Sequence, residues 1–271
     1  MAAPVAPPLR WAGGKRWLLP VIRRLVGSRE FAAYHEPFLG GASVFLGLQE
    51  FPSAHLRDAN SELISTYRVI RDSHAAVAEK VATFTNDAET YYAARAADPE
   101  DKIERAARFV YLNHTSFNGI YRVNLAGVYN VPFGGRKWVN IPTAQHLSEV
   151  ASKLRRASLR SGDFARSLDA IGEDDLVFLD PPYTVAHNNN GFIKYNQRLF
   201  SFDDQRRLSQ FIDEVKVRGA YYILANAAHH SIATLFDKGD LRIETNRRNS
   251  IGGANAVRGG ATEYLFTNLK T

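Results

Sequence analysis

The sequence predicts an α/β protein, a sheet whose strands alternate with helices, with a mostly helical segment inserted into it. Short apolar runs with β-branched or aromatic residues recur along the chain, and helical patterns lie between several of them. Strand, turn and helix in repetition are typical of an α/β sheet. The alternation stops between residues 61 and 157, where residues 75–110 are rich in Ala, Glu, Arg and Tyr and favour helix.

Local patterns place the individual elements. Strands are expected at residues 33–36, 54–57, 176–179, 221–225, 241–244 and 264–266, and helices at 15–26, 43–49, 62–72 and 202–217. Gly219 stands where the last of these helices should end. Residues 111–142, dense in Asn, Gly and aromatics, should form an irregular loop or hairpin. We therefore predict a flexible Ala/Pro-rich tail at 1–8, a main domain built from 9–60 and 158–271, and an inserted domain at 61–157.

Composition excludes several classes of protein. The chain has 271 residues, 45% of them hydrophobic and 23% charged, which is an ordinary globular balance. It has no cysteine, which excludes disulfide scaffolds, cysteine-ligated zinc and cysteine nucleophiles. No apolar run approaches the ~20 residues of a membrane helix, and the N-terminus lacks the pattern of a secretory signal. We expect a cytoplasmic protein that does not bind membranes.

The net charge of +6 is unevenly distributed. Residues 95–160 contain 11 Lys and Arg against 5 Asp and Glu, an excess equal to that of the whole chain. A basic surface of this kind suits nucleic acid, and a solvated charged face explains the same count equally well.

The tetrapeptide Asp180-Pro181-Pro182-Tyr183 follows the apolar strand LVFL. Ligands of open α/β sheets lie beyond the carboxyl ends of the strands. The prolines stiffen the turn and remove backbone donors, which leaves carbonyl oxygens and the Asp180 carboxylate as acceptors beside an aromatic ring. Such a site suits a planar group that bears an NH₂. A strand-ending turn with a buried tyrosine is the plainer alternative.

A second candidate site is HEPFLGGAS at residues 35–43, where glycines follow one expected strand and open a helix. Such glycines let a cofactor approach the backbone closely. Asp58 ends the next expected strand, 18 residues after Gly40, and so matches the acidic residue that binds ribose hydroxyls in nucleoside-binding folds. The fingerprint G-x-G-x-x-G is absent, which argues against NAD. Taken alone, the glycine pair fits a simple tight turn equally well.

Trp11-Ala12-Gly13-Gly14-Lys15 precedes an expected amphipathic helix. Its backbone N–H groups and Lys15 could bind an acid group or a phosphate. It lacks the first glycine and the Ser/Thr of a P-loop, which excludes an ATPase of that class. A glycine-rich helix cap is the alternative.

Together these motifs resemble the Dam-type, D12-class DNA adenine-N6 methyltransferases of the α group. The shared order is W-A-G-G-K, E-P-F-x-G-G-x-S, D-A-N at 58–60, G-D-F at 162–164 and D-P-P-Y. In the insert, residues 111–113 and 117–119 also resemble the family. Arg122-x-Asn124 with residues 130–134 resembles its DNA-contacting hairpin, and residues 246–260 resemble the loop before its last strand. Ala42 stands where the family usually has a second glycine, and the flanks of the insert differ, so a GATC target is not implied.

The resemblance implies a Rossmann-like methyltransferase sheet with an inserted helical DNA-recognition domain, S-adenosylmethionine as cofactor and duplex DNA as substrate. The implied cofactor-binding residues are Trp11, Gly13, Gly14, Lys15, Glu36, Pro37, Phe38, Gly40, Asp58, Asp163, Phe164 and Asp180. The target adenine would flip into a site formed by Asp180, Pro181, Pro182 and Tyr183, with no metal and no covalent intermediate. The implied DNA-binding residues are Asn118, Gly119, Arg122, Asn124 and Asn130. The histidines, His35 and His114 among them, are expected to be structural.

Several alternatives stay open at this stage. An N4-cytosine methyltransferase has a similar site but more often carries S-P-P-Y or S-P-P-W, a relative without catalysis would only bind DNA, and RNA or protein amides could replace DNA. Arg122 could read a guanine, clamp a phosphate or form a salt bridge within the hairpin. A restriction-modification role with a cognate endonuclease, in a bacterial, phage or plasmid setting, is compatible with the resemblance.

Overall fold

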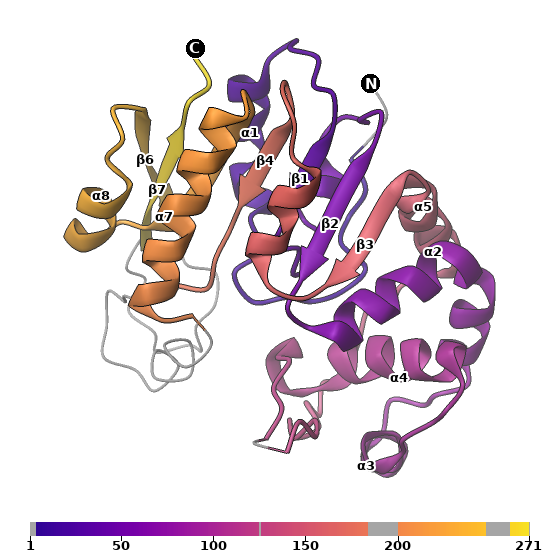
Figure 1. Cartoon of the computed structure of the whole chain (residues 1–271). Helices are drawn as coiled ribbons and strands as arrows, with labels where there is room; N and C mark the ends of the chain where they lie inside the picture. The colour runs from indigo at the N-terminus through magenta and orange to yellow at the C-terminus, as the bar shows by residue number, and fades with distance from the viewer. Residues whose placement is uncertain (1–3, 125, 184–199, 248–260, 271) are drawn as a thin grey trace. The chain divides into compact units, whose positions relative to one another are not determined.

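The computed structural model describes residues 4–124, 126–183, 200–247 and 261–270, and the structural statements below concern these ranges. Figure 1 labels the helices and strands. Their bounds are η1 Arg16–Leu18, α1 Leu19–Val26, β1 Tyr34–Glu36, η2 Phe45–Gly47, β2 Ala54–Asp58, α2 Ser61–Ala82, α3 Ala88–Ala96, α4 Lys102–Thr115, η3 Phe117–Gly119, α5 Ala144–Leu154, β3 Ala157–Ser161, η4 Phe164–Ala170, β4 Leu176–Leu179, α7 Phe202–Val217, β5 Tyr221–Ala227, α8 His230–Phe236, β6 Leu241–Arg247 and β7 Ala261–Thr267.

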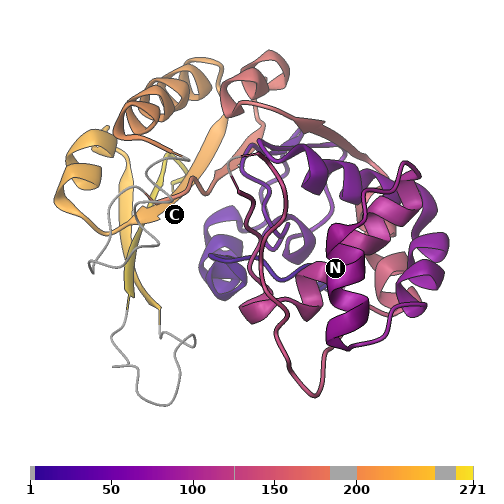
Figure 2. The same cartoon turned by 90° about the horizontal axis from the view of Figure 1, so that it is seen from below.

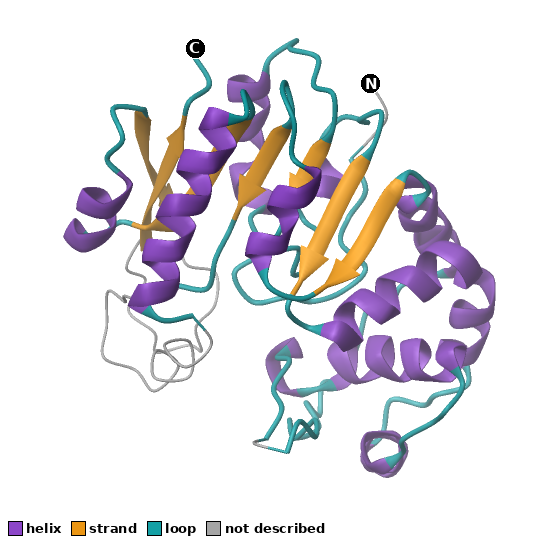
Figure 3. Cartoon of the chain, viewed as in Figure 1, coloured by secondary structure: helices purple, strands orange, loops and turns teal. Residues whose placement is uncertain are grey.

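The described strands form a seven-stranded sheet in the order β3-β2-β1-β4-β5-β7-β6. β1 is parallel to β2 and β4, and β4 is parallel to β5. β7 is antiparallel to both β5 and β6. Figure 3 shows helices and strands interspersed along the chain. Because parallel neighbours need crossover connections, usually helices, this is the α/β class that the sequence predicted, and that prediction is confirmed.

Most elements lie where the local patterns placed them. β4 and α7 have the predicted bounds, and Gly219 follows α7 with a φ of 75°, the left-handed conformation of a helix C-terminus. The helix predicted at 43–49 is wrong. Only the short 3₁₀ turn η2 forms there, because Leu48 is already extended, with ψ 175°. β3 at the sheet edge was not predicted, since its outer residues are exposed and its apolar pattern is weak.

The chain divides into two compact units, and one of them comprises residues 20–38, 51–57 and 163–271. In this unit, β4 and β5 present Val177, Leu179, Tyr222 and Leu224 to one buried cluster, into which α7 and α8 also pack. The alternate residues of each strand point to the same face, as the pleat requires. Figures 1 and 2 show α7 lying along the strands of this unit. The cluster therefore fixes β4, the strand that leads into Asp180.

The other unit comprises residues 1–19, 39–50 and 58–162 and is largely helical. α2 packs against both α4 and α5, and Figures 1 and 2 show α2 and α4 side by side. Side-chain oxygens of Asn60, Asp87, Asp101 and Thr143 accept backbone N–H bonds at the starts of α2, α3, α4 and α5. These caps divide the predicted helical stretch into separate helices. The limits 61–157 for an inserted domain stay a prediction.

The N-terminal segment differs from the flexible tail expected at 1–8. Val5 donates its N–H to the Leu46 carbonyl at 3.1 Å. The carbonyls of Ala6 and Pro8 accept hydrogen bonds from the imidazoles of His146 and His114, each at 2.8 Å. Residues 5–8 are therefore held against the helical unit, because these side chains satisfy backbone groups that a free tail would leave to water. No helix among the described residues is long and apolar enough to cross a membrane.

Candidate active site

Asp180 leaves β4 at its carboxyl end, between the ends of two parallel neighbours, β1 and β5. All four residues of β4 are buried, Pro181 is buried, and Asp180 and Tyr183 are half-buried. The carboxyl ends of parallel strands meet at one edge of a sheet, where ligands of such folds bind. The tetrapeptide thus follows β4 as the sequence predicted, and Glu36 ends the neighbouring strand β1, with Pro37 and Phe38 directly after it.

Glu36 at the end of β1 is a buried carboxylate with a fixed partner. Its exposed fraction is 2%, and its Oε2 accepts a hydrogen bond from the hydroxyl of Tyr34 at 2.7 Å. Burial, reinforced by the Glu36 charge, raises the pKa of Tyr34 well above its ordinary value. The tyrosine therefore stays a donor and holds the carboxylate in place.

A buried amide pair lies at the end of β5, and sequence reasoning missed it. Asn226 and Gln205 are both fully buried. The Asn226 Nδ2 donates to the Gln205 Oε1 at 3.0 Å, and the Asn226 Oδ1 accepts the N–H of Ala227 at 2.8 Å. The signal in the sequence was an Asn directly after the apolar run YYILA. The pair ties α7 to the strand beside the tetrapeptide.

Phe38 and Phe164 form an aromatic wall in the same unit. Their rings stack at 5.2 Å, and Phe200 meets Phe38 edge-on at 5.6 Å. Next to them, the Asp163 Oδ1 accepts bonds from the N–H of Ala165 and from Arg207, both at 2.9 Å. The Arg207 guanidinium also lies 5.0 Å from the Phe164 ring centroid. The second Asp163 oxygen accepts no hydrogen bond from the described residues, so it is available to a ligand's amine. The sequence did not single out Arg207.

Asp58 and the glycine loop come together in the helical unit. The Asp58 Oδ2 accepts the N–H of Gly40 at 2.8 Å, and its Oδ1 accepts the N–H of Asn60 at 2.9 Å. Burial raises the pKa of Asp58, against these two hydrogen bonds, which lower it. Each carboxylate oxygen can accept about two bonds. Both oxygens therefore retain capacity for the two hydroxyls of a ribose.

Gly40 has a steric reason to be glycine. Its φ is 47°, and a Cβ there would lie 2.8 Å from Trp11 Cδ1. A Cβ on Gly41 would lie 2.9 Å from the Trp11 Cβ. Lys15, only 3% exposed, donates its N–H to the Ser43 hydroxyl at 2.9 Å and its Nζ to the Gly13 carbonyl at 2.8 Å. The W-A-G-G-K turn is thus packed against the glycine loop by Trp11 and joined to it by the hydrogen bond from Lys15 to Ser43.

A hairpin lies between residues 116 and 133, inside the loop or hairpin predicted at 111–142, but residues 111–115 differ from the prediction because they form the end of α4. Bridges join Ser116 to Phe133 and Val123 to Tyr129. The Asn124 Oδ1 accepts the N–H groups of Ala126 and Val128, both at 3.0 Å, and so caps the turn. Among the residues expected to bind DNA, Asn124 therefore has a structural role in the hairpin itself.

Arg122 is exposed and is held by a second candidate, Asn130. The Arg122 Nε donates to the Asn130 Oδ1 at 2.8 Å, and its Nη2 donates to the Asn130 carbonyl at 3.3 Å. Asn118 is exposed and Gly119 is buried, and both have a left-handed φ, 55° and 64°. In the described part of the chain, Arg122 thus bonds within the hairpin to an amide and not to a carboxylate, unlike the salt bridge that was one of the sequence alternatives, and other guanidinium donors remain for a ligand.

His35 and His55 also have structural partners, as His114 and His146 do. The His35 Nε2 bonds to the Asp175 Oδ2 at 2.8 Å, and the His35 ring stacks on His55 at 4.7 Å. Burial alone would raise the pKa of Asp175, but hydrogen bonds, that from His35 first, hold it below the ordinary value.

Residues 11–250 match the family described as D12 class N6 adenine-specific DNA methyltransferase. The chain belongs to this family. It is 33% identical, over 97% of its length and 95% of the relative's, to the type II methyltransferase M1.LlaDCHI of Lactococcus lactis subsp. cremoris. It is 32% identical to the DNA adenine methylase of Escherichia coli K12, over 95% and 93% of the two chains. It is 31% identical to the type II methyltransferase M.MjaIII of Methanocaldococcus jannaschii, over 82% and 84%.

The predicted family and activity are therefore confirmed, and the alternatives to adenine N6 are not favoured. This D12-class enzyme is an adenine-specific DNA methyltransferase, and the reaction of its family implies a methyl donor of the S-adenosylmethionine type.

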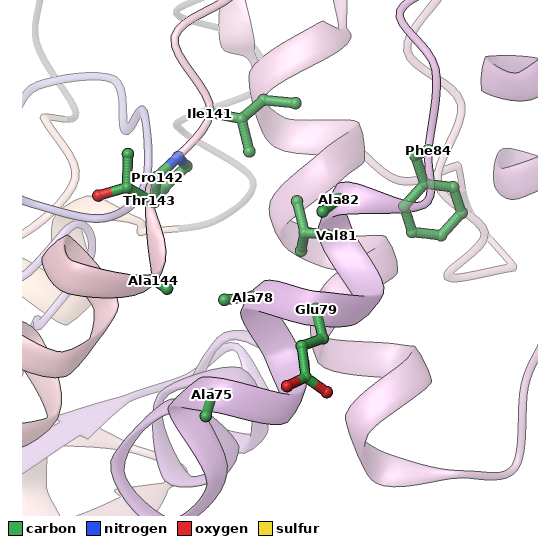
Figure 4. Close-up of a pocket in the computed structure, with 10 residues that line it drawn as sticks. All are labelled: Ala75, Ala78, Glu79, Val81, Ala82, Phe84, Ile141, Pro142, Thr143 and Ala144. Carbon is green, nitrogen blue, oxygen red and sulfur yellow. The ribbon is translucent and has the colours of Figure 1, made fainter.

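The D12-class enzyme also has a pocket of about 500 Å³ in its helical unit, between the second half of α2 and the segment leading into α5 (Figure 4). Its lining residues are Ala75, Ala78, Glu79, Val81, Ala82, Phe84, Ile141, Pro142, Thr143 and Ala144. Glu79 is the one charged residue among these ten. None of the predicted site residues is among these ten.

Proposed function

We propose that this chain transfers a methyl group from S-adenosylmethionine to N6 of an adenine flipped out of duplex DNA. The observation that carries the proposal is Asp180-Pro181-Pro182-Tyr183 at the carboxyl end of β4, between the ends of β1 and β5. Prolines there leave acceptors without competing backbone donors. Acceptors beside a ring fit an amine on a planar base.

Two groups of residues, one in each unit, suit different parts of the cofactor. Asp58 would accept from the ribose hydroxyls through the capacity that Gly40 and Asn60 leave on its oxygens. The second oxygen of Asp163 would accept from the amine of the cofactor's adenine, beside the Phe38 and Phe164 rings. When bound, the cofactor supplies an electrophilic methyl group on a sulfonium. The protein's part is to hold and orient it.

Asp180 and the Pro181 carbonyl would accept the two N6 hydrogens, and Tyr183 would stack on the base. These bonds orient the nitrogen lone pair toward the methyl group, and orientation of this kind accounts for a large share of many enzymatic rate gains. Flipping costs a few kcal/mol of stacking and pairing. The contacts of the tetrapeptide offset that cost.

The hairpin and the basic residues around it are the proposed DNA face. Arg122 is exposed on a turn that Asn124 braces, and Asn130 orients its guanidinium. A planar fork presented in this way suits guanine O6 and N7 in the major groove. The proposed location is the cytoplasm of a bacterium or a phage host, since similar enzymes come from Lactococcus lactis and Escherichia coli. A cognate restriction endonuclease is a further proposed partner, since two of the relatives are type II methyltransferases by name.

The test is mass spectrometry of nucleosides from duplex DNA treated with the enzyme and methyl-labelled S-adenosylmethionine. We expect labelled N6-methyladenine. We expect Asp180→Ala to lower its rate by roughly 100-fold or more while cofactor affinity stays within a few fold. Asp203→Ala is the matched control, because that aspartate is 82% exposed on α7. Labelled N4-methylcytosine, or full turnover by Asp180→Ala, would overturn the proposal.

A further inference from the structure

Trp11 contacts two parts of the helical unit, the glycine loop proposed to bind the cofactor and the hairpin proposed to bind DNA. On one side its ring atoms approach Gly40 so closely that a Cβ there would lie 2.8 Å from Cδ1. On another side its ring stacks on Tyr121, with centroids 5.6 Å apart and planes 25° from parallel. Gly40 belongs to the proposed cofactor loop, and Tyr121 directly precedes Arg122 in the hairpin.

Tyr121 is itself anchored to the helices. Its hydroxyl donates to the Glu62 Oε2 at 3.0 Å, and the Glu62 Oε1 lies 3.5 Å from the Arg108 guanidinium on α4. Its ring also packs at 5.4 Å from Phe109 and at 5.7 Å from Tyr129 of the hairpin. A ring held on so many sides transmits a displacement of the hairpin to whatever stacks on it.

The chain before Trp11 is fastened to the same elements. Asn113 on α4 accepts the N–H of Arg10 at 2.7 Å and donates to its carbonyl at 2.8 Å. The Arg10 side chain lies against Gly119, where a Cβ would come within 2.7 Å of its Nε. Residues 8–11, which we call the strap, are thus joined to the end of α4 and to the hairpin by their backbone and by their side chains.

We propose that the stack of Trp11 on Tyr121 couples cofactor binding to DNA binding, with Tyr121 as a positioning residue. This rests on the proposed function, since it assigns the glycine loop to the cofactor and the hairpin to DNA. A duplex that orders the hairpin also orders Tyr121, and through it the Trp11 face of the glycine loop. Coupling between two sites is reciprocal, so the cofactor strengthens DNA binding by the same factor.

The test measures the affinity for S-adenosylhomocysteine, which has no methyl group to transfer, with and without a duplex that the enzyme methylates. In the parent enzyme we expect the duplex to raise the affinity about 5-fold or more. Tyr121→Leu removes the stack and should bring that ratio to within about twofold of one. Tyr121→Phe, the matched control, keeps the ring and loses only the bond to Glu62, so it should retain most of the ratio. A structural defect alone would lower the affinity for S-adenosylhomocysteine both with and without the duplex, and would leave the ratio of the two affinities unchanged.

A second measurement needs no variant at Tyr121. The chain has three tryptophans, so Trp17→Phe with Trp138→Phe leaves Trp11 as the only one. We expect its fluorescence to change when the duplex is added without cofactor. An unchanged ratio in Tyr121→Leu, a ratio of one in the parent, or a silent Trp11 would each overturn the coupling. Failure of the proposed function would instead show as a parent enzyme that forms no N6-methyladenine.

Discussion

At Gly40, the absence of a methyl group avoids both backbone strain and a clash with Trp11. Its left-handed φ costs a non-glycine residue roughly 1–2 kcal/mol, and a Cβ would also press on Trp11 at 2.8 Å. We expect Gly40→Ala to lower the free energy of unfolding by more than the backbone cost alone and to weaken cofactor binding. Gly239→Ala is the control, since its φ is 72° and no described atom lies within 4 Å of the added Cβ. Equal losses in denaturant titrations would contradict a role for the Trp11 contact.

Ala42 gives the opposite case, because replacing it by glycine would relieve backbone strain but would also lose a buried methyl group and add backbone freedom. Its φ of 55° explains why the family usually has glycine there, and relief of that strain would gain roughly 1–2 kcal/mol. Its methyl group, however, is fully buried. Losing that burial costs ~0.8 kcal/mol, and the added backbone freedom costs roughly 0.5–1 kcal/mol. We therefore expect Ala42→Gly to change the free energy of unfolding by less than about 1 kcal/mol, measured by urea titration. A larger change in either direction would show that one of these effects is misjudged.

At the scale of elements, the hairpin makes a prediction about specificity. If Arg122 reads a base, Arg122→Ala should cost roughly 1–3 kcal/mol at the true site and relax discrimination at one position. Asn130→Ala should do the same more weakly, because Asn130 holds the guanidinium through its Oδ1 at 2.8 Å. The measurement is methylation of a panel of duplexes that vary each base flanking the adenine. A phosphate clamp would instead weaken all sequences alike, with the preference intact.

The hydrogen bond between His114 and Pro8 of the strap leads us to expect that stability depends on pH. Burial, with Arg10 and His146 nearby, lowers the pKa of His114 against its bond to the Pro8 carbonyl. A histidine with a lowered folded pKa binds fewer protons than in the unfolded chain, so its contribution to stability is lost as pH falls below the ordinary value of about 6.5. We expect the Tm to fall between pH 7.5 and 5.5 by more in the wild type than in His114→Gln. Parallel Tm curves for the two proteins would rule out this histidine as the cause.

How far the sequence predicts each element depends on whether local signals or distant contacts decide it. The tetrapeptide after β4, the glycine that ends α7 and the hairpin all followed from residues within a few positions. The helix expected at 43–49 failed because distant packing decides that segment, where a Cβ on Gly47 would lie 2.4 Å from the Leu19 side chain. Arg207 beside Asp163 and Gln205 beside Asn226 were missed for the same reason, since each pairs residues more than 20 positions apart. Of the loop expected at 246–260, residues 246–247 end β6 and residues 248–260 lie outside the described ranges.

At the scale of the whole molecule, the exposed basic residues should determine how many DNA phosphates the enzyme contacts. Of the basic residues at 95–160, several are held by carbonyl groups within the unit, among them Arg95, Arg108 and Arg136. Those bonds leave the charge in place but fix the side chain. Lys102, Lys137, Arg155 and Arg156 are exposed. The number of phosphate contacts should therefore be smaller than the count of basic residues in the sequence.

Each phosphate contact contributes about −0.9 to the slope of log K against log salt for duplex DNA. With roughly three to five contacts we expect a slope of about −3 to −4.5. Lys137, exposed and close in sequence to the hairpin strand that ends at Phe133, should contribute one contact, so Lys137→Ala should make the slope shallower by about 0.9 at any DNA sequence. Lys238→Ala is the control, because that ammonium is paired with Asp213 at 2.6 Å in the other unit. Binding titrations over a range of salt concentrations give both slopes. A flat dependence, or an equal change in the two variants, would mean that the basic residues at 95–160 do not form the DNA face.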